Sequence, residues 1–320
     1  MGAKSKKSGP VTGPEDTSES LVKLIGLPGL SDYLHFVKTR VVNGAALETG
    51  ALVDEWRRAN DHLHAIEQAE TGLADTITTH ALPASLRQKR RTLRANPYFR
   101  ESFDDLPTTI EMVELRHLVV SQESVGTEFS ESIAKRLGKA PTPEALFDFC
   151  LPLGRRLPPM QVQRLGDEHY LFVSNSTDFR AHNLTLVTGA AVPKLNTFGP
   201  AGAALILPIG FGSNFLSAVK SEKRIVLQNG YHRAFALMSL GITHAPMVIQ
   251  HVTRTDELRL AASSDVYENP AFYFRSARPP MLKDFLDPAL AKPFRIWPLE
   301  TRVEVEIKIV NATSPAGRPC

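Results

Sequence analysis

The pattern of apolar and polar positions along the chain predicts a fold that combines helices with strands. From residue 18 to about residue 95, apolar side chains recur at helical spacing, and the longest helix is expected over about residues 50–70. Leu21, Leu24 and Ile25 share one face at the start of this region. Strand-like and helical patterns alternate further along. An α+β or α/β fold is therefore expected, with residues 18–105 as a helical N-terminal extension.

The strongest strand–helix–strand pattern lies between residues 225 and 250. Apolar runs at 225–228 and 246–250 predict two strands, and residues 231–240 predict a helix between them. Asn229 is expected to cap that helix, because its side-chain oxygen can accept a hydrogen bond from the first turn. Gly230 permits a tight turn before the helix, and Gly241 is expected to end it.

Two basic side chains, His232 and Arg233, stand in the first turn of the predicted helix. Free backbone amides, the helix dipole and a permanent cation together favour an anion at this point. The alternative is an ordinary packing unit whose helix serves only the core. His232 alone does not decide between them, since a single histidine is more often a surface group than a catalyst.

The stretch Asn229-Gly230-Tyr231-His232-Arg233, followed by Ala236, resembles the G-x-x-R-x-x-A signature of the ParB/sulfiredoxin-like superfamily. It is also similar to the D-G-H-H-R stretch of the free serine kinases. The resemblance implies that these residues bind the phosphates of ATP, ADP or CTP together with Mg²⁺. Two positions depart from the pattern. Asn229 replaces the aspartate of the kinases and cannot act as a carboxylate base, and Tyr231 replaces the cysteine of the sulfiredoxins.

A predicted strand at 110–115, followed by Leu118-Val119-Val120-Ser121-Gln122, is similar to the opening of the ParB-like fold, so the core is expected over residues 106–252. The resemblance adds Gln122 to the nucleotide site. It also implies a catalytic glutamate from outside the D-G-H-H-R stretch. The sequence does not select among the candidates, and each is otherwise an ordinary surface carboxylate: Glu111, Glu114, Glu123 and Glu128. Glu111 and Glu114 fall on opposite faces of a regular strand. Together with His232 they are the catalytic candidates.

Residues 154–222 exceed a minimal domain of that family, and their short β-rich runs predict a small added sheet. Arg180 ends a polar stretch that would suit a phosphate or carboxylate, although a loop closed by its own side chains is the alternative. A glycine-bearing turn with Gly212, Ser213 and Asn214 is expected to precede a helix at 215–219. These three residues would then face the 229–233 turn across one cleft. The turn fits neither a Rossmann fingerprint nor a Walker loop.

The run from Arg87 to Arg94 is predicted to lie on a helix. Such a run can contact phosphates, but it is more often a solvated face. Aromatic residues are sparse around it, so nucleic-acid binding is not favoured. A small net charge of +3 over 320 residues agrees with this.

Residues 253–312 are expected to clamp over the core through an apolar face that includes Met281 and Phe285. Strict alternation over 302–309 predicts an edge strand with its apolar residues inward: Val303, Val305, Ile307 and Ile309. This region lacks the helix-turn-helix pattern that a DNA-associated ParB regulator requires.

Composition and the lack of targeting signals indicate the cellular compartment that is expected for this chain. Cys150 and Cys320 are too few for a disulfide framework, which favours a reducing compartment, and no set of residues has the spacing of metal ligands. Cys150 lies on the apolar face of a helix expected to start at Thr142-Pro143, and is expected to be an inert core thiol. No apolar run reaches the length of a membrane span, and residues 1–17 are predicted to be a disordered tail, so a cytoplasmic protein is expected.

The function predicted from these features is an ATP- or CTP-dependent phosphotransferase or nucleotide hydrolase that acts on a small molecule. A DNA-associated regulator and a catalytically silent nucleotide-binding protein are the alternatives. The N-terminal helices would serve as a cap on the core or as the face of a homodimer.

Overall fold

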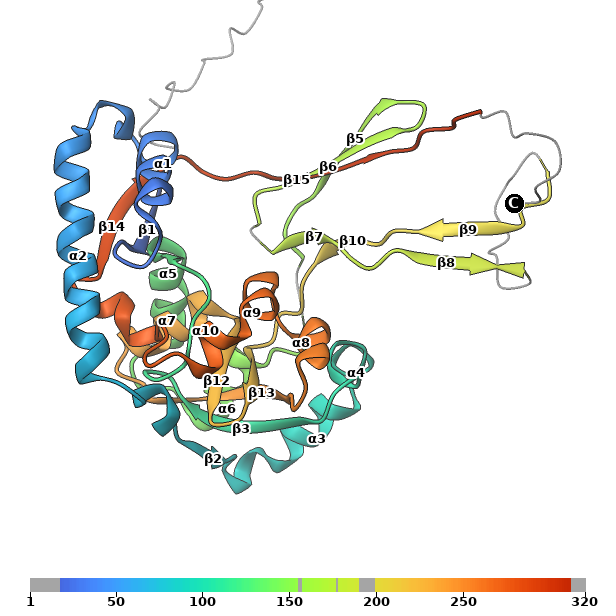
Figure 1. The fold of residues 1–320 in the computed structure, drawn as a ribbon. Coiled ribbons are helices and arrows are strands. Elements are labelled where there is room, and N and C mark those ends of the chain that lie inside the picture. Colours follow the sequence, from blue (N-terminus) through green and yellow to red (C-terminus); the bar gives the residue numbers. More distant parts are fainter. Residues whose placement is uncertain (1–17, 155–156, 177, 190–198, 312–320) are drawn as a thin grey trace, which may run out of the picture. The chain divides into compact units, whose positions relative to one another are not determined.

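The computed structural model describes residues 18–154, 157–176, 178–189 and 199–311 (Figure 1). The chain divides into two compact units. Unit 1 comprises Met1–Arg155 and Ser213–Trp297, and unit 2 comprises Arg156–Gly212 and Pro298–Cys320. The predicted tail over residues 1–17 lies outside the described residues, as does Cys320.

Unit 1 contains helices and two sheets. Its strands are β1 (Glu19–Leu24), β2 (Thr79–Ala81), β3 (Thr108–Glu114), β4 (Ser124–Gly126), β11 (Ser217–Ser221), β12 (Arg224–Asn229), β13 (His244–His251) and β14 (Ala291–Ile296). Its α-helices are α1 (Leu30–Arg40), α2 (Thr49–Ala69), α3 (Arg87–Ala95), α4 (Pro97–Phe103), α5 (Thr127–Leu137), α6 (Pro143–Cys150), α7 (Tyr231–Ser239), α8 (Thr255–Ala261), α9 (Ser264–Glu268) and α10 (Pro270–Arg275). Short 3₁₀ helices lie at Gly44–Ala46, Leu73–Thr76, Ala84–Leu86 and Leu282–Leu286.

The central sheet has the strand order β12-β11-β13-β3-β2. β11 and β12 form an antiparallel hairpin, β13 runs parallel to β11, and β3 is antiparallel to β13. The apolar residues of β11, β12 and β13 are almost fully buried, which explains their continuous apolar sequence. α7 links β12 to β13 and buries Ala234, Leu237 and Met238. The fold is therefore a mixed α+β arrangement, as predicted.

The second sheet of unit 1 has the order β14-β1-β4, with Leu21 opposite Phe294. The N-terminal helices pack beside it, and Tyr33 of α1 and Leu52 of α2 share one core cluster with Phe294. The long helix predicted near residues 50–70 is confirmed as α2. The helical prediction is wrong for Glu19–Leu24, because pairing with β14 and β4 overrides a spacing of apolar residues that suits a helix.

The described residues of unit 2 form strands: β5 (Gln161–Gly166), β6 (His169–Ser174), β7 (Phe179–Ala181), β8 (Thr185–Thr188), β9 (Ala203–Ile206), β10 (Ile209–Phe211) and β15 (Thr301–Glu306). They pair as β15-β6-β5, β10-β7 and β8-β9. β15 is an edge strand with alternating exposure, as its sequence predicts. It ends at Glu306, however, and Ile307 and Ile309 are 55% and 82% exposed rather than inward.

The boundaries of the added sheet differ from those predicted at 154–222. Its described strands end at Phe211, and Ser217–Ser221 belongs to the central sheet as β11. The C-terminal region also divides, since residues 253–297 belong to unit 1 whereas β15 belongs to unit 2. None of the described helices combines the length and the apolar composition that a membrane crossing requires.

Candidate functional site

Glycines form both turns of the predicted strand–helix–strand unit, which is present as β12, α7 and β13. Gly230 has a φ of 94° and Gly241 a φ of 80°, conformations that other residues adopt only with strain. A Cβ at Gly230 would also lie 2.6 Å from Leu216 Cδ1. The predicted cap at Asn229 is wrong. Gly230 is the N-cap without a side-chain bond, and Asn229 Nδ2 donates to the carbonyl of Ser213, because Asn229 still belongs to β12.

The amino ends of α5 and α7 meet at His232. A Cβ at Gly126, the N-cap of α5, would lie 3.0 Å from Nε2 of His232, so the missing side chain makes room for the imidazole. The ring of Phe129 stands edge-on to His232, with 5.3 Å between the ring centroids. Neither helix has a side-chain cap. The first turns of both helices therefore contain amides without intrahelical partners, and these two turns lie next to each other at Gly126 and His232.

The surroundings of His232 favour the neutral form of its imidazole. Burial lowers its pKa, and the positive charge of Arg233 lowers it further. A neutral imidazole offers one N–H donor and one acceptor nitrogen. The ring N–H of His232 would thus donate to a bound anion. The negative charge of that ligand would also raise the pKa of His232 and favour its protonation.

Arg233 has a different role from the one expected. Its Nη1 donates to the backbone carbonyls of Asn214 at 2.7 Å, Cys150 at 3.1 Å and Phe149 at 3.4 Å. The guanidinium thereby ties the end of α6 and the segment before β11 to the first turn of α7. It contributes positive charge to the site while its hydrogen bonds hold the backbone together.

Tyr231 is a buried structural residue. Its hydroxyl accepts from the backbone N–H of Ser121 at 3.0 Å and donates to the carbonyl of Leu227 at 2.8 Å. Burial raises its pKa. These bonds dock the 118–122 segment beside α7, where the side chain of Gln122 is exposed. Gln122 is thus the next residue after the one that Tyr231 holds, and its place in a nucleotide site stays a prediction.

Ser213 and Asn214 lie directly against the 229–233 turn, hydrogen-bonded to it through their carbonyls rather than facing it across a cleft. The helix predicted at 215–219 is wrong. Phe215, Leu216 and Val219 are fully buried, and Ser217–Ser221 pairs with both β12 and β13. The segment forms a strand because it is buried on both faces of the sheet, although the glycine-bearing turn before it resembles the start of a helix.

Gly212 and Arg180 belong to unit 2, where both interact with Asp178. Arg180 Nη2 contacts Asp178 Oδ1 at 2.5 Å, and the N–H of Gly212 donates to the Asp178 carbonyl at 3.1 Å. The backbone of Asp178 also donates to the Ser176 hydroxyl. The polar stretch thus closes on itself, which was the alternative to an anion site.

The two glutamates predicted on β3 do not join the amino end of α7. Glu114 ends β3 opposite His244, beyond the carboxyl end of the helix, and accepts from the N–H of Thr78 at 3.0 Å. Because a nine-residue helix is about 13 Å long, Glu114 and His232 are at opposite ends of α7. Glu111, in the middle of β3, lines a groove beside α3.

Other carboxylates lie nearer to the two helix ends. Glu128 stands in the first turn of α5 and pairs with Arg295 at 2.8 Å, and Glu123 pairs with Lys23 at 2.6 Å. The charge of Asp265 in α9 acts on Tyr231 and Tyr273 and raises the pKa of both, after the larger effect of burial. The sequence offers Gly126-Thr127 after an apolar residue as a weak signal of the α5 start. It offers none for Asp265, whose position depends on tertiary packing.

No known protein family, curated protein or solved structure matches this chain. Within the described ranges, no group of three or more His, Cys, Asp or Glu side chains is arranged to hold a metal ion.

Proposed function

We propose that this chain is a ParB-like nucleotide-binding protein that holds phosphates at the amino ends of α5 and α7. One observation carries this proposal: two helix ends without side-chain caps meet at His232. Each helix end favours negative charge through its dipole and through first-turn amides that lack intrahelical partners, and two such ends on one ligand would reinforce each other. The resemblance of the 229–236 stretch to the ParB/sulfiredoxin-like signature supports the same ligand class.

Each group has a distinct role in the proposed complex. The N–H groups of the first turns would donate to phosphate oxygens, and His232 would add a ring donor. Arg233 would position the turn through its three carbonyl contacts and add positive charge. Mg²⁺ would arrive with the nucleotide and neutralise the remaining phosphate charge.

The proposed activity is transfer of a phosphoryl group to a small molecule, or its hydrolysis, for which positioning and charge neutralisation supply most of the catalysis. A base would come from the carboxylates beside α5, Glu123 or Glu128, because Glu114 stands at the other end of α7. Release of the ion pair with Lys23 or Arg295 would accompany that role.

Calorimetry with ATP, ADP and CTP, each with and without Mg²⁺, tests the binding site. His232→Gln is expected to weaken binding by about tenfold, because the amide keeps a neutral donor but cannot become the cation that an anionic ligand favours. His244→Gln is the matched control, because it makes the same change beyond the opposite end of α7. Failure of the wild type to bind any of the three at about 1 mM, or equal binding by the His232 variant, would overturn the proposal.

A nucleotide-binding protein without turnover is the second candidate. Asn229 and Tyr231 occupy the acid and thiol positions of the related signatures, and both are engaged in structural hydrogen bonds. Phosphate release measured at saturating nucleotide separates the two functions: turnover that Glu123→Gln or Glu128→Gln abolishes favours the enzyme, and binding without release favours the silent protein.

The homodimer and the cytoplasmic location stay predictions. Leu52 and Ala59 on the inner face of α2 pack within the chain's own core, so a dimer would have to use the outer face of that helix. Light scattering during size-exclusion chromatography measures the oligomeric state.

A further inference from the structure

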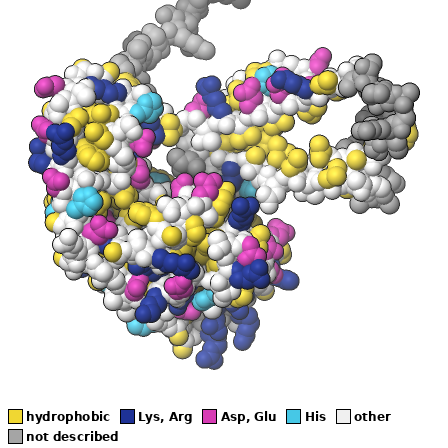
Figure 2. All heavy atoms as spheres, in the orientation of Figure 1, with side chains coloured by type: hydrophobic (Ala, Val, Ile, Leu, Met, Phe, Trp, Pro, Cys, Tyr) yellow, Lys and Arg dark blue, Asp and Glu magenta, His cyan; other side chains and the backbone are white. Residues whose placement is uncertain are grey.

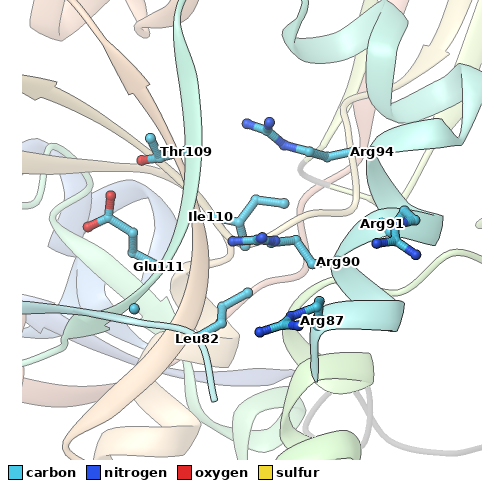
Figure 3. Close-up of a pocket in the computed structure, with 9 residues that line it drawn as sticks. Leu82, Arg87, Arg90, Arg91, Arg94, Thr109, Ile110 and Glu111 are labelled. Carbon is cyan, nitrogen blue, oxygen red and sulfur yellow. The ribbon is translucent and has the colours of Figure 1, made fainter. Parts of the chain in front are cut away.

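A groove of about 690 Å³ lies between α3 and the edge of the central sheet formed by β2 and β3. Arg87, Arg90 and Arg94 extend from α3 toward β3 (Figure 3). Ile110 points from β3 toward the arginines, whereas the side chains of Thr109 and Glu111 lie on the other side of the strand (Figure 3). The volume falls within the range of small-molecule pockets, about 300–1,000 Å³.

Helix periodicity gathers the arginines on this side. Leu86 and Leu93, seven positions apart, are fully buried and fix the inner face of the helix. Arg87, Arg90, Arg91 and Arg94 follow the i, i+3, i+4, i+7 spacing of a single stripe. Lys89 lies outside it and bonds both carboxylate oxygens of Asp148 at 2.6 and 2.7 Å. Figure 2 shows Lys and Arg side chains gathered at the end of unit 1 where α3 lies.

The stripe carries charge that the chain itself does not neutralise. In the described part of the structure, Arg87, Arg90 and Arg91 form no ion pair, and Arg94 bonds the backbone carbonyl of Thr108. Like charges three and four positions apart destabilise a helix. Glu111 is the acidic residue among those lining the groove. An anionic ligand would relieve a repulsion that the free protein retains.

We propose that this groove binds a ligand with two or more neighbouring phosphate groups. A guanidinium binds phosphate through two parallel hydrogen bonds, which favours arginine over lysine in such sites. Along the helix axis, Arg87 lies about 6 Å from Arg91 and about 10 Å from Arg94, more than one phosphate can span. The site is separate from His232 and does not depend on the proposed function.

Free nucleotides and single-stranded nucleic acids both present neighbouring phosphates, so the test uses one probe of each kind. Binding of ATP is measured by calorimetry, and binding of a labelled oligothymidylate by fluorescence anisotropy across a salt series. The test variant is Arg87→Gln/Arg90→Gln, in which both residues are exposed and unpaired, so the fold should persist. The matched control is Lys89→Gln, on the same helix but facing Asp148. His232→Gln is a second control that weakens only the other site.

The double variant is expected to bind at least one of the two probes about tenfold or more weakly than the wild type. Lys89→Gln and His232→Gln are expected to leave the affinity of the groove for that probe unchanged. If the oligonucleotide is the ligand, the slope of log affinity against log salt should fall by about 1.4 for the two lost charges. Loss of ATP alone identifies a free nucleotide. The proposal is overturned if the wild type binds neither probe, or if the double variant, folded by circular dichroism, binds both as the wild type does.

Discussion

At the scale of single residues, Arg278 is a cation whose side chain is completely buried among its partners. Its side chain is 0% exposed and donates to both oxygens of Asp284, at 2.9 and 2.6 Å, and to Glu70 at 3.0 Å. Lys283 also contacts Glu70. A buried charge is tolerated only when its partners replace the lost water. The cluster therefore holds the 278–284 segment against the C-terminal end of α2, where Glu70 lies.

Arg278→Ala is expected to lower the free energy of unfolding by about 3–5 kcal/mol, because Asp284 is left buried without a counter-charge. Arg57→Ala is the control: Arg57 and its partner Asp54 are 66% and 65% exposed, and such pairs contribute about 0–1 kcal/mol. Urea titration of both variants measures the difference. If both variants lost a similar free energy of unfolding, the buried Arg278 cluster would contribute no more to stability than an exposed ion pair.

Arg233 illustrates how a residue in a ligand-binding signature also acts as a support. Arg233→Ala removes three bonds to carbonyls and is expected to cost about 2 kcal/mol or more of stability. His232→Gln, one position away, should unfold close to the wild type. Thermal unfolding of the two variants checks this, and an Arg233→Ala protein as stable as the wild type would show that the carbonyl contacts are dispensable.

At the scale of elements, the contact between α5 and α7 depends on Gly126. Its backbone conformation would suit any residue, so glycine is needed there only for the space that it leaves. Gly126 has a φ of −66° and a ψ of 122°, which alanine adopts without strain. A methyl group there would press on His232 Nε2 at 3.0 Å and displace the imidazole by a few tenths of an ångström. A substitution at Gly126 is therefore expected to affect ligand binding more than it affects the stability of the fold.

Gly126→Ala is expected to change the free energy of unfolding by less than about 1 kcal/mol while weakening nucleotide binding by about tenfold. Gly50→Ala near the start of α2, where the new methyl group approaches only the Glu48 carboxylate, is the matched control. Calorimetry with the best-binding nucleotide compares the two. Wild-type affinity in Gly126→Ala would show that the position of His232 does not matter for the ligand.

The sequence predicts those elements whose signals are local. Thr142 caps α6 by accepting from the N–H of Ala145 at 3.2 Å, and the left-handed glycines bound α7, both as expected. β1 and β11 are missed because their strand character arises from pairing with distant segments; Leu21 lies opposite Phe294. The candidate site follows the same division: the α7 turn is predicted, whereas the α5 end and Asp265 are brought to it by packing.

At the scale of the whole molecule, three histidines couple stability to pH. Burial is the largest cause of the lowered pKa of His232, His244 and His251, and nearby positive charge adds to it. Below the ordinary value of 6.5, the unfolded chain binds protons that the folded chain does not. Stability therefore rises with pH through this window, is fully present above about 6.5 and is lost as pH falls toward the folded pKa values.

Urea unfolding from about pH 8 to about pH 5 should show this loss, and His232→Gln, His244→Gln and His251→Gln together should flatten it. Carboxylates with lowered pKa values, such as Asp287, act in a separate window below their ordinary pKa of 3.8. A slope that persists in the triple variant would assign the pH dependence to other groups.

The two units differ in how much side-chain burial supports their strands. β11 and β12 form an antiparallel pair with a fully buried interior, including Val219 and Val226. β8 and β9 form an antiparallel pair in which Leu186 and Leu205 are 63% and 67% exposed. Two-stranded pairs without a buried face are marginal in water.

Hydrogen exchange should therefore be faster in β8–β9 than in β11–β12 by orders of magnitude, although both pairs form the same kind of backbone hydrogen bonds. Mass spectrometry of peptides from the four strands measures it in one sample, so that pH and temperature are matched. Because the ladder chemistry is common to both pairs, the ratio of rates isolates the contribution of packing. Equal protection would require that a surface outside the chain, such as a bound partner, covers the exposed leucines of β8 and β9.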